Sequence, residues 1–185
     1  MKKSTLIILY LSLFLLSACV QVIKPSANNY SQLSLSSVWD LPIKYPVGST
    51  FSLSPKYVKG ASLDSKDIDV IYQLYANAIS EGLSQRGYRR VEHNASVDFY
   101  VGFGVALSKD LSDKNISDKF GVTPGLSENA LFEKGSFLIY VEDAKSNQRV
   151  WRGAVQGFVQ ENFNSAERKE RTEAVVKMIL LQFFK

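Results

Sequence analysis

The sequence is poor in the residues that most often carry out chemistry: it has one cysteine, Cys19, and one histidine, His93. A single cysteine excludes an intramolecular disulfide, so packing alone must stabilise the folded core. Zinc and copper sites usually combine three or four His, Cys or carboxylate ligands, and a lone histidine falls short of those sets. The G-x-S-x-G pattern of a hydrolase nucleophile elbow is also missing. The sequence therefore indicates no catalytic motif and no cofactor.

A strong excess of either charge is missing as well. Lys and Arg number 22, and Asp and Glu number 18. Without Lys2 and Lys3, which lie in a segment that we expect to be removed, the net charge falls from +4 to +2. Binding to nucleic acid usually demands a dense basic face, so we expect no nucleic-acid partner. The 45% hydrophobic and 22% charged residues are typical of a folded globular chain of one domain.

The longest apolar run is too short to cross a membrane. Residues 6–16, LIILYLSLFLL, make eleven mostly apolar positions, whereas a bilayer-spanning helix needs about 20. The run follows two lysines and is followed by the small residues Ser17 and Ala18. A basic start, a short apolar centre and small residues at the end are the marks of a cleaved export signal.

The position of the only cysteine makes this interpretation more specific. Leu16, Ser17, Ala18 and Cys19 resemble the lipobox of bacterial lipoproteins. The resemblance implies recognition of Leu16–Ala18 by the signal peptidase, cleavage before Cys19, a diacylglyceryl group on its sulfur and an acylated amino terminus. This covalent lipid is the only non-protein group that we expect. The alternative is an ordinary secretory signal whose cysteine is accidental.

The residue after the cysteine bears on the destination. In Gram-negative lipoproteins an aspartate at this position usually signals retention in the inner membrane, and here it is Val20. The resemblance therefore implies the periplasmic side of the outer membrane.

We divide the chain into a removed signal peptide (1–18), a lipidated cysteine with a Ser- and Asn-rich tether (19–45), and a folded domain (46–185).

The domain shows the periodicity of an α+β fold. A strand is predicted near 48–53, a helix over 63–88, a strand over 97–107, a hairpin over 135–159 and a final helix from Asn164. Asp64 or Ser65 is expected to cap the first helix and Gly87 to end it. The buried stripes predicted for the two helices are Ile68, Ile71, Tyr75, Ala78 and Gly82, and Thr172, Val175, Val176, Ile179, Leu180 and Phe183.

These elements predict a single domain with an antiparallel-dominated sheet and two helices packed on one face. The other face carries glycines and polar residues and is expected to be partly exposed. Gly82 is expected to let the first helix pack closely on the sheet. Across the hairpin we expect Asp143 to face Arg152 with Trp151 covering the pair, either as a turn-stabilising ion pair or as a recognition corner.

Residues 108–134 form a long segment with little apolar periodicity. Segments of this length inside a compact domain tend to be functional or disordered. Its apolar residues are candidates for partner contact, with folding back onto the sheet as the alternative: Phe120, Leu126, Leu131 and Phe132. Its acidic residues lack the spacing of a calcium-binding loop.

The order of these features resembles a known family. The lipobox, GLSQRGY at 82–88, VDFYVGFGVAL at 97–107 and GSFLIYVEDAKSNQRVWRG at 135–153, followed by a last helix, are similar to lipoproteins with domain of unknown function 4136. The resemblance covers about residues 48–184. It implies an α+β domain behind a lipoprotein leader and no established reaction, so no functional residues are carried over.

Three functions remain open at this point. The first is a non-enzymatic module of the cell envelope that binds a protein, glycan or lipid, or serves a structural role. The second is a carrier of an apolar ligand held between sheet and helices, which needs a lined cavity. The third is an unrecognised hydrolase, which needs a pocket with two carboxylates about 5–10 Å apart.

Overall fold

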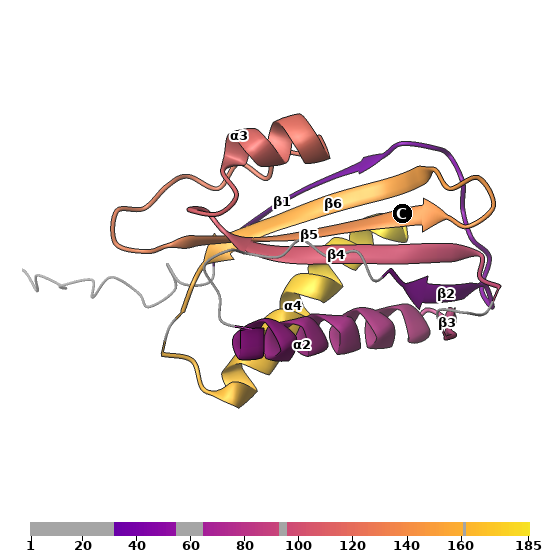
Figure 1. The fold of residues 1–185 in the computed structure, drawn as a ribbon, viewed down its shortest axis with the longest axis horizontal. Helices are drawn as coiled ribbons and strands as arrows, with labels where there is room; N and C mark the ends of the chain where they lie inside the picture. Colours follow the sequence, from indigo (N-terminus) through magenta and orange to yellow (C-terminus); the bar gives the residue numbers. More distant parts are fainter. Residues whose placement is uncertain (1–31, 55–64, 93–95, 161) are drawn as a thin grey trace, which may run out of the picture.

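A six-stranded mixed sheet with helices on both faces makes up the domain (Figure 1). This computed structural model describes residues 32–54, 65–92, 96–160 and 162–185. The elements in chain order are β1 (Leu33–Trp39), β2 (Thr50–Leu53), α2 (Ser65–Ser84), β3 (Arg89–Arg90), β4 (Phe99–Leu107), α3 (Asp113–Asn115), the π-helical turn η3 (Ile116–Phe120), β5 (Lys134–Asp143), β6 (Arg149–Phe158) and α4 (Ser165–Phe183). The order across the sheet is β1-β6-β5-β4-β2-β3.

The sheet is antiparallel on one side and parallel on the other. β1, β6, β5 and β4 pair antiparallel, while β2 pairs parallel with both β3 and β4. Parallel strands need a long crossover connection, and α2 supplies the one between β2 and β4. The α+β class of the single domain is confirmed, with α2 and α4 on one face of the sheet (Figure 1). The parallel pairs of β2 and the helical segment of α3 and η3 on the other face were not predicted.

Helix α4 matches its prediction residue by residue. The side chain of Asn164 accepts hydrogen bonds from the backbone N–H groups of Ala166 and Glu167, and the Glu167 carboxylate accepts one from the Asn164 N–H. This capping box satisfies N–H groups that have no partner within the helix. The buried residues of α4 are those of the predicted stripe: Thr172, Val175, Val176, Ile179, Leu180 and Phe183.

The buried arc of helix α2 overlaps the predicted stripe only in part: Ala78 is buried and Tyr75 packs against the core as predicted, whereas the burial of Ile79 and Leu83 was not predicted. Its buried residues are Ala76, Ala78, Ile79 and Leu83. The helix packs against both the sheet and α4, so its buried arc is wider and rotated. A Cβ on Gly82 would lie 2.8 Å from Leu180 Cδ1, so this glycine permits close contact with α4 and not, as predicted, with the sheet.

The expected tether over 19–45 is wrong for part of its length, because Leu33–Trp39 form the edge strand β1. Its register on β6 runs from Leu33 opposite Gly157 to Trp39 opposite Trp151. The stretch LSLSSVW alternates as a strand must, with Leu33, Leu35 and Trp39 packed against the core and serines between them. A composition rich in serine concealed this alternation. Residues 19–31 lie outside the described residues.

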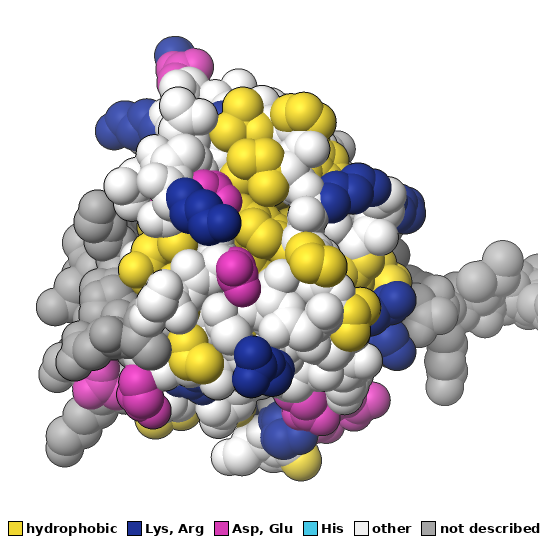
Figure 2. Space-filling view, turned by 90° about the vertical axis from the view of Figure 1, so that its right-hand side faces the viewer, with side chains coloured by type: hydrophobic (Ala, Val, Ile, Leu, Met, Phe, Trp, Pro, Cys, Tyr) yellow, Lys and Arg dark blue, Asp and Glu magenta, His cyan; other side chains and the backbone are white. Residues whose placement is uncertain are grey.

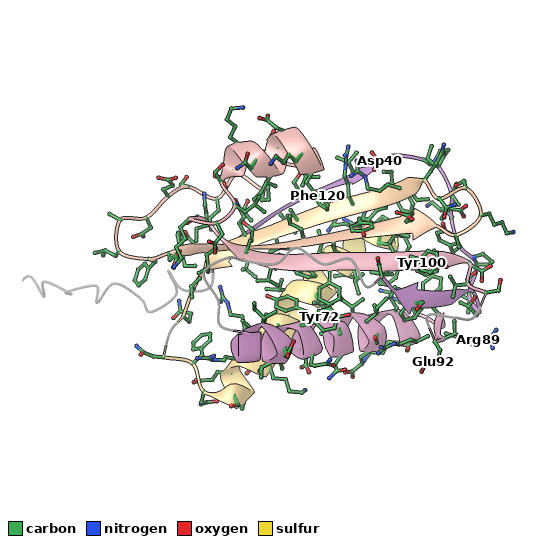
Figure 3. All side chains as sticks on the ribbon, in the orientation of Figure 1. Asp40, Tyr72, Arg89, Glu92, Tyr100 and Phe120 are labelled. Atoms are coloured by element: carbon green, nitrogen blue, oxygen red, sulfur yellow. The ribbon has the colours of Figure 1, made fainter. Side chains whose placement is uncertain are left out.

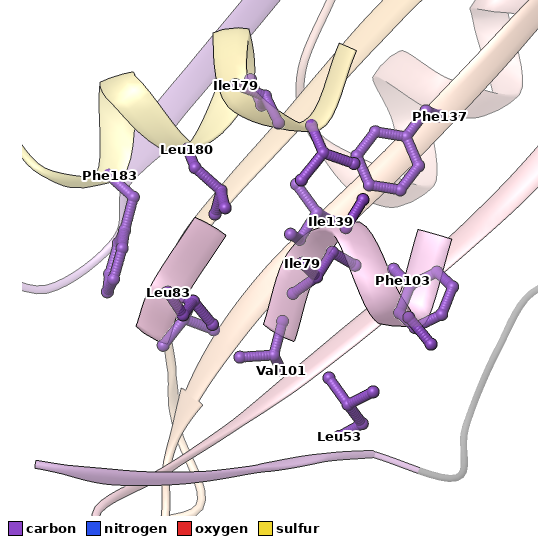
Figure 4. Packing of buried hydrophobic residues seen from close by; sticks show 14 of the residues in the cluster. Leu53, Ile79, Leu83, Val101, Phe103, Phe137, Ile139, Ile179, Leu180 and Phe183 are labelled. Carbon is purple, nitrogen blue, oxygen red and sulfur yellow. The ribbon is translucent and has the colours of Figure 1, made fainter. Parts of the chain in front are cut away.

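Large apolar side chains fill the layer between sheet and helices (Figure 4). Fully buried members come from β2, β4, β5, β6, α2 and α4: Phe51, Phe99, Val101, Ile139, Trp151, Ile79, Leu83 and Ile179. Aromatic rings of Tyr75 and Phe137 stack at 4.5 Å between centroids, and those of Tyr72 and Phe103 at 4.9 Å. A close-packed layer of this kind supports the fold and leaves little room for an apolar ligand.

Candidate binding surface on the outer sheet face

The strand register arranges the outer face, which is the face opposite α2 and α4, into rows of side chains. Side chains alternate across a sheet, so each row contains one residue from each neighbouring strand. From the start of β1 towards its end, three rows run across β1, β6, β5 and β4: Ser34, Gln156, Ser136, Ala106; then Ser36, Ala154, Leu138, Gly104; then Val38, Arg152, Tyr140, Gly102. Beyond them lie Glu142 and its partner Tyr100.

The segment between β4 and β5 folds back over the first two rows. Ile116 in η3 and Val122 are buried against Leu138 and Ala154 in a second apolar cluster, and Phe120 packs at its margin. The alternative that the long segment folds onto the sheet is therefore confirmed for its apolar centre. Arg152 of the third row packs against Gly121 in the cover, while Tyr140, Gly102 and the pair Glu142 and Tyr100 lie outside the second apolar cluster. Among the described residues, the outer face is thus divided into a closed half and an open half (Figure 3).

A buried polar network holds the cover in place. Lys134 in β5 is 4% exposed, and its Nζ donates to Asp113 Oδ2 at 2.5 Å and to the Leu126 carbonyl at 3.2 Å. Gln156 is fully buried, donates to Asp113 Oδ1 at 2.6 Å and to Ser136 Oγ at 3.2 Å, and accepts from the Leu126 N–H. Partial burial alone raises the pKa of Asp113, but the bonds from Lys134 and Gln156 outweigh it and lower that pKa below its usual value.

The network predicts unequal effects of removing its two charges. Asp113→Asn leaves the buried Lys134 ammonium without its counter-charge, which costs roughly 2–3 kcal/mol after allowance for the partial exposure of Asp113. Lys134→Met leaves instead a carboxylate that is 42% exposed and can be hydrated, at a cost of about 1 kcal/mol. Urea unfolding of the processed chain carrying Cys19→Ser measures both values.

The exposed ion pair of Lys109 and Glu133, 3.6 Å apart, provides the control. Glu133→Gln should change the free energy of unfolding by less than about 1 kcal/mol, because solvent screens such a pair. Equal destabilisation by Lys134→Met and Asp113→Asn would show that the unpaired Lys134 ammonium is not the main reason why Asp113→Asn lowers the free energy of unfolding.

The open half begins with a tyrosine that lies flat on a glycine. A Cβ on Gly102 would fall 2.1 Å from Cζ of Tyr140, so only glycine leaves room for this ring across β4. Tyr140 and Tyr100 are both half-buried and present part of their surface to solvent. Tyrosine combines an apolar ring face with a polar hydroxyl, which suits it to binding surfaces.

A charged corner borders the tyrosines where β1 ends. Asp40 accepts from Arg149 Nε at 2.9 Å and pairs with the Arg152 guanidinium at 3.0 Å (Figure 3). The Arg149 guanidinium carbon lies 5.8 Å from the centroid of the Phe120 ring, and Arg152 packs against Gly121. One carboxylate thus orients two arginines beside an aromatic ring. We call Val38, Asp40, Tyr100, Tyr140 and Arg152 the open surface.

The predicted pairing of Asp143 with Arg152 is wrong, because strand alternation places them on opposite faces. Arg152 belongs to the outer face, whereas Asp143 lies on the helix side, where it accepts hydrogen bonds from the Ser146 N–H at 2.8 Å and the Tyr45 hydroxyl at 3.1 Å. Trp151 is fully buried on that same helix side. Asp143 therefore organises the hairpin turn.

The predicted contact residues do not form one surface. Phe120 borders the charged corner, the backbone of Leu126 belongs to the buried network, and Leu131 and Phe132 lie at the far tip of the segment. Leu131 is 82% exposed, and Phe132 packs on Phe158 with ring centroids 6.0 Å apart. Leu16, Ser17, Ala18, Cys19 and His93 lie outside the described residues.

Sequence reasoning overlooked the open surface. A signal was present in the alternation of Gly102 and Gly104 with large residues in β4, because glycines in a strand leave room for a side chain to lie flat on it, but that signal does not identify Tyr140. The pairing of Asp40 with Arg149 spans 109 positions. Only the addition of β1 to the sheet brings those two residues together.

Two further carboxylates, Asp98 and Asp143, hold backbone segments in place. Asp98 accepts from the Thr50 N–H at 2.7 Å and from the Thr50 hydroxyl at 3.0 Å. The backbone bond from Thr50 lowers the pKa of Asp98, and the backbone bond from Ser146 lowers that of Asp143. A general acid needs a raised pKa, so neither carboxyl suits that role. Within residues 32–54, 65–92, 96–160 and 162–185, no group of three or more His, Cys, Asp and Glu side chains is placed to hold a metal.

An open groove of about 260 Å³ lies between α2 and α4, on the side away from the sheet. Gly82, Leu180, Leu181 and Phe184 form its apolar part, and Glu81, Arg86, Glu173 and Lys177 are among its charged residues. A carrier of apolar ligands needs an enclosed apolar cavity, and this groove is open and mixed in polarity.

No helix in the described part of the chain is both long and apolar enough to span a bilayer.

Comparisons with solved structures found similar proteins, and the first two named here show the same fold. A DUF4136 family protein from Bacteroides thetaiotaomicron is 16% identical, with a TM-score of 0.54 over 81% of this chain and 95% of that one. A PDZ domain protein from Parabacteroides distasonis is 12% identical, with a TM-score of 0.53 over 82% of this chain and 36% of that one. The PelC dodecamer from Paraburkholderia phytofirmans is 8% identical, with a TM-score of 0.46 over 80% and 95%.

No curated protein matches the sequence. The family model described as Domain of unknown function (DUF4136) matches residues 44–183, which include every element from β2 to α4. The match covers well over half of the chain and agrees with the resemblance found in the sequence. The chain therefore belongs to the DUF4136 family.

Proposed function

We propose that the protein is a lipid-anchored lipoprotein of the bacterial cell envelope that binds a partner without catalysing a reaction. The anchor is the acylated Cys19, and Val20 favours the periplasmic side of the outer membrane. The order of basic start, apolar run, small residues and cysteine supports this location. Intact-mass measurement of the membrane-extracted protein tests it: the expected mass is that of residues 19–185 plus a diacylglyceryl group and an amide-linked acyl chain.

The open surface is the observation that carries the binding role. A pinned cover closes half of the outer face, while the other half keeps two half-buried tyrosines and the pair of Asp40 and Arg149 at its surface, beside a mostly buried Arg152. Aromatic residues and arginine are the side chains most enriched in protein interfaces. The cover over one half of the outer face requires a buried charge network, and yet the other half is left open. This difference favours the interpretation that the open half binds a partner.

The chemistry of the open surface suits an envelope protein or a glycan. Tyrosine rings pack on peptide groups or on the flat faces of sugars, while arginine donates to carbonyl or carboxylate oxygens. Asp40 already neutralises part of the positive charge, so a strongly anionic partner is not required. A lipid partner fits less well, because the surface mixes charges with aromatic rings.

Photo-crosslinking in living cells tests this role. A photoreactive phenylalanine analogue is introduced at Val38, which is 37% exposed and shares a row with Arg152 and Tyr140. We expect a discrete crosslinked product, reduced roughly tenfold or more by Tyr140→Ala, since central tyrosines often contribute about 2 kcal/mol to binding. The analogue at Gln73, exposed on α2, serves as the control.

A product that forms equally at Gln73, or that persists unchanged in Tyr140→Ala, would place the partner elsewhere. Tyr140→Ala is expected to keep its fold, because the side chain lies outside the main core, and circular dichroism of the variant tests this. Digestion of the product with proteases and with glycosidases distinguishes a protein from a glycan.

A further inference from the structure

The described chain begins at the end of the sheet where the cover segment has its tip. β1 starts at Leu33, opposite Gly157 near the end of β6, and the Ser34 hydroxyl donates to the Pro124 carbonyl in the cover. Figure 1 shows the tip of this segment at the same end of the molecule as the start of β1. The hairpin turn between β5 and β6 lies at the opposite end.

The tip is an ordered turn that presents a leucine to solvent. The Asn129 side-chain oxygen accepts from the Leu131 N–H at 2.8 Å, and the Asn129 carbonyl accepts from the Phe132 N–H at 3.3 Å. Phe132 packs on Phe158, which fixes the turn to β6. Leu131 nevertheless remains 82% exposed, more than any other large hydrophobic side chain among the described residues.

Apolar exposure alone does not distinguish the two ends. Val47 is 80% exposed near the start of β2, and hydrophobic side chains gather at this hairpin-turn end as well (Figure 2). The difference is the distance from the anchor. Thirteen residues separate Cys19 from Leu33, which reach at most about 45 Å when fully extended and average about 20 Å when flexible.

The connection from Cys19 joins the sheet at the end that carries the tip. Strands of ten residues are about 33 Å long, so the hairpin-turn end lies about that far from Leu33, where the connection from Cys19 joins the sheet, whereas the tip lies at the same end as Leu33 (Figure 1). An attachment of this length raises the effective concentration of the tip at the bilayer surface. Even a single leucine then contributes to binding, because its transfer from water is favourable.

The charged residues around the tip limit how deeply the tip can enter the bilayer. Glu128 is exposed in the same turn, and Glu133 pairs with Lys109 just behind it. A carboxylate does not enter the hydrocarbon core, so contact extends only to the boundary between headgroups and acyl chains. This geometry fits one leucine inserted between headgroups while Glu128 stays in water.

We propose that Leu131 is a second membrane contact, which rests the anchor end of the domain on the bilayer carrying Cys19. The inference rests on the proposed lipid anchor. The two contacts together set the orientation of the domain, with the strands directed away from the membrane. Asp40 and Tyr100, near the hairpin-turn end, then face the periplasm and its partners.

Fluorescence quenching tests the contact. Leu131→Cys and Val47→Cys are made separately in the lipidated full chain, where the Cys19 sulfur is blocked, and each new thiol is labelled with an environment-sensitive fluorophore. The proteins are placed in vesicles of phosphatidylethanolamine and phosphatidylglycerol that contain lipids with a nitroxide near the headgroup. We expect quenching and a blue-shifted emission at position 131, several-fold stronger than at position 47.

Equal quenching at the two positions, or none at 131, overturns the proposal. Intact-mass measurement first establishes whether Cys19 carries lipid, so failure of the anchor is recognised separately. If Cys19 is a bare thiol, the chain without its leader and with Cys19→Ser is attached through an amino-terminal histidine tag to nickel-chelating lipids in the same vesicles. The same comparison between 131 and 47 then supports or overturns the contact on its own.

Discussion

Replacing Trp151 by alanine is expected to lower the free energy of unfolding by about 3–5 kcal/mol, as is usual when a buried aromatic side chain is removed. Trp151 is fully buried and lies between Trp39 of β1 and Val141 of β5 on the helix side of β6. Its ring centroid is 5.3 Å from that of Phe183 in α4. The cavity would therefore open where the edge strand, the hairpin and the last helix meet.

Urea unfolding of the processed chain with Cys19→Ser measures this loss. Trp151→Phe is the matched variant: it retains much of the ring volume and removes the Trp151 Nε1–H, which is buried without a hydrogen-bond partner in the described residues. Its cost should be about 1–2 kcal/mol, because the smaller cavity is partly offset by the loss of an unpaired polar group. A loss below about 1 kcal/mol for Trp151→Ala would show that the core closes over the gap.

Replacing Cys19 by alanine, in a chain whose residues 1–18 are exchanged for an ordinary cleavable secretory signal, is expected to release the protein from the membrane almost completely. Each buried methylene contributes about 0.8 kcal/mol, so two or three acyl chains make dissociation negligible, and their loss leaves only weak contacts. Leu131 alone cannot retain the domain once the anchor is gone. Fractionation of cells into membrane and soluble material, followed by immunoblotting, measures the change.

Val20→Asp is the matched control for Cys19→Ala, since it alters the adjacent residue and keeps the sulfur. It should remain in the membrane fraction and move towards the inner membrane, as the lipobox resemblance implies. Retention of Cys19→Ala in membranes at the level of the unaltered protein would contradict the anchor. Salt and carbonate washes of the membranes separate such retention from loose adsorption.

Local patterns predicted the elements that are set by local interactions. The last helix was predicted from the capping pair Asn164 and Glu167 and from apolar residues at three- and four-residue steps. Both signals lie within the helix itself, so the sequence of that segment is enough to predict it. The hairpin and β4 were predicted from alternation for the same reason. β1 was missed because its alternating leucines are separated by serines, which occur equally often in connecting segments.

Long-range contacts decided what periodicity left open. Helix α2 contacts both the sheet and α4, and these two contacts together determine which of its residues are buried. The apolar pattern of α2 alone does not show which elements it will contact. Lys134 and Asp113 belong to a segment without periodicity, and their pairing depends on how that segment crosses the sheet. The same crossing separates Phe120 from Leu131, which the sequence grouped as one set of contact residues.

By itself, the sequence determined the α+β class, the last helix and the family, and it predicts the export signal and the lipidation of Cys19 through the lipobox resemblance, because each depends on residue order over short spans. Only the tertiary structure decided that half of the outer face is covered, that Asp40 orients Arg149 and Arg152, and that Leu131 lies at the end of the sheet where β1 begins. Those features arise when strands and loops distant in sequence are brought side by side, and no local spacing encodes that proximity.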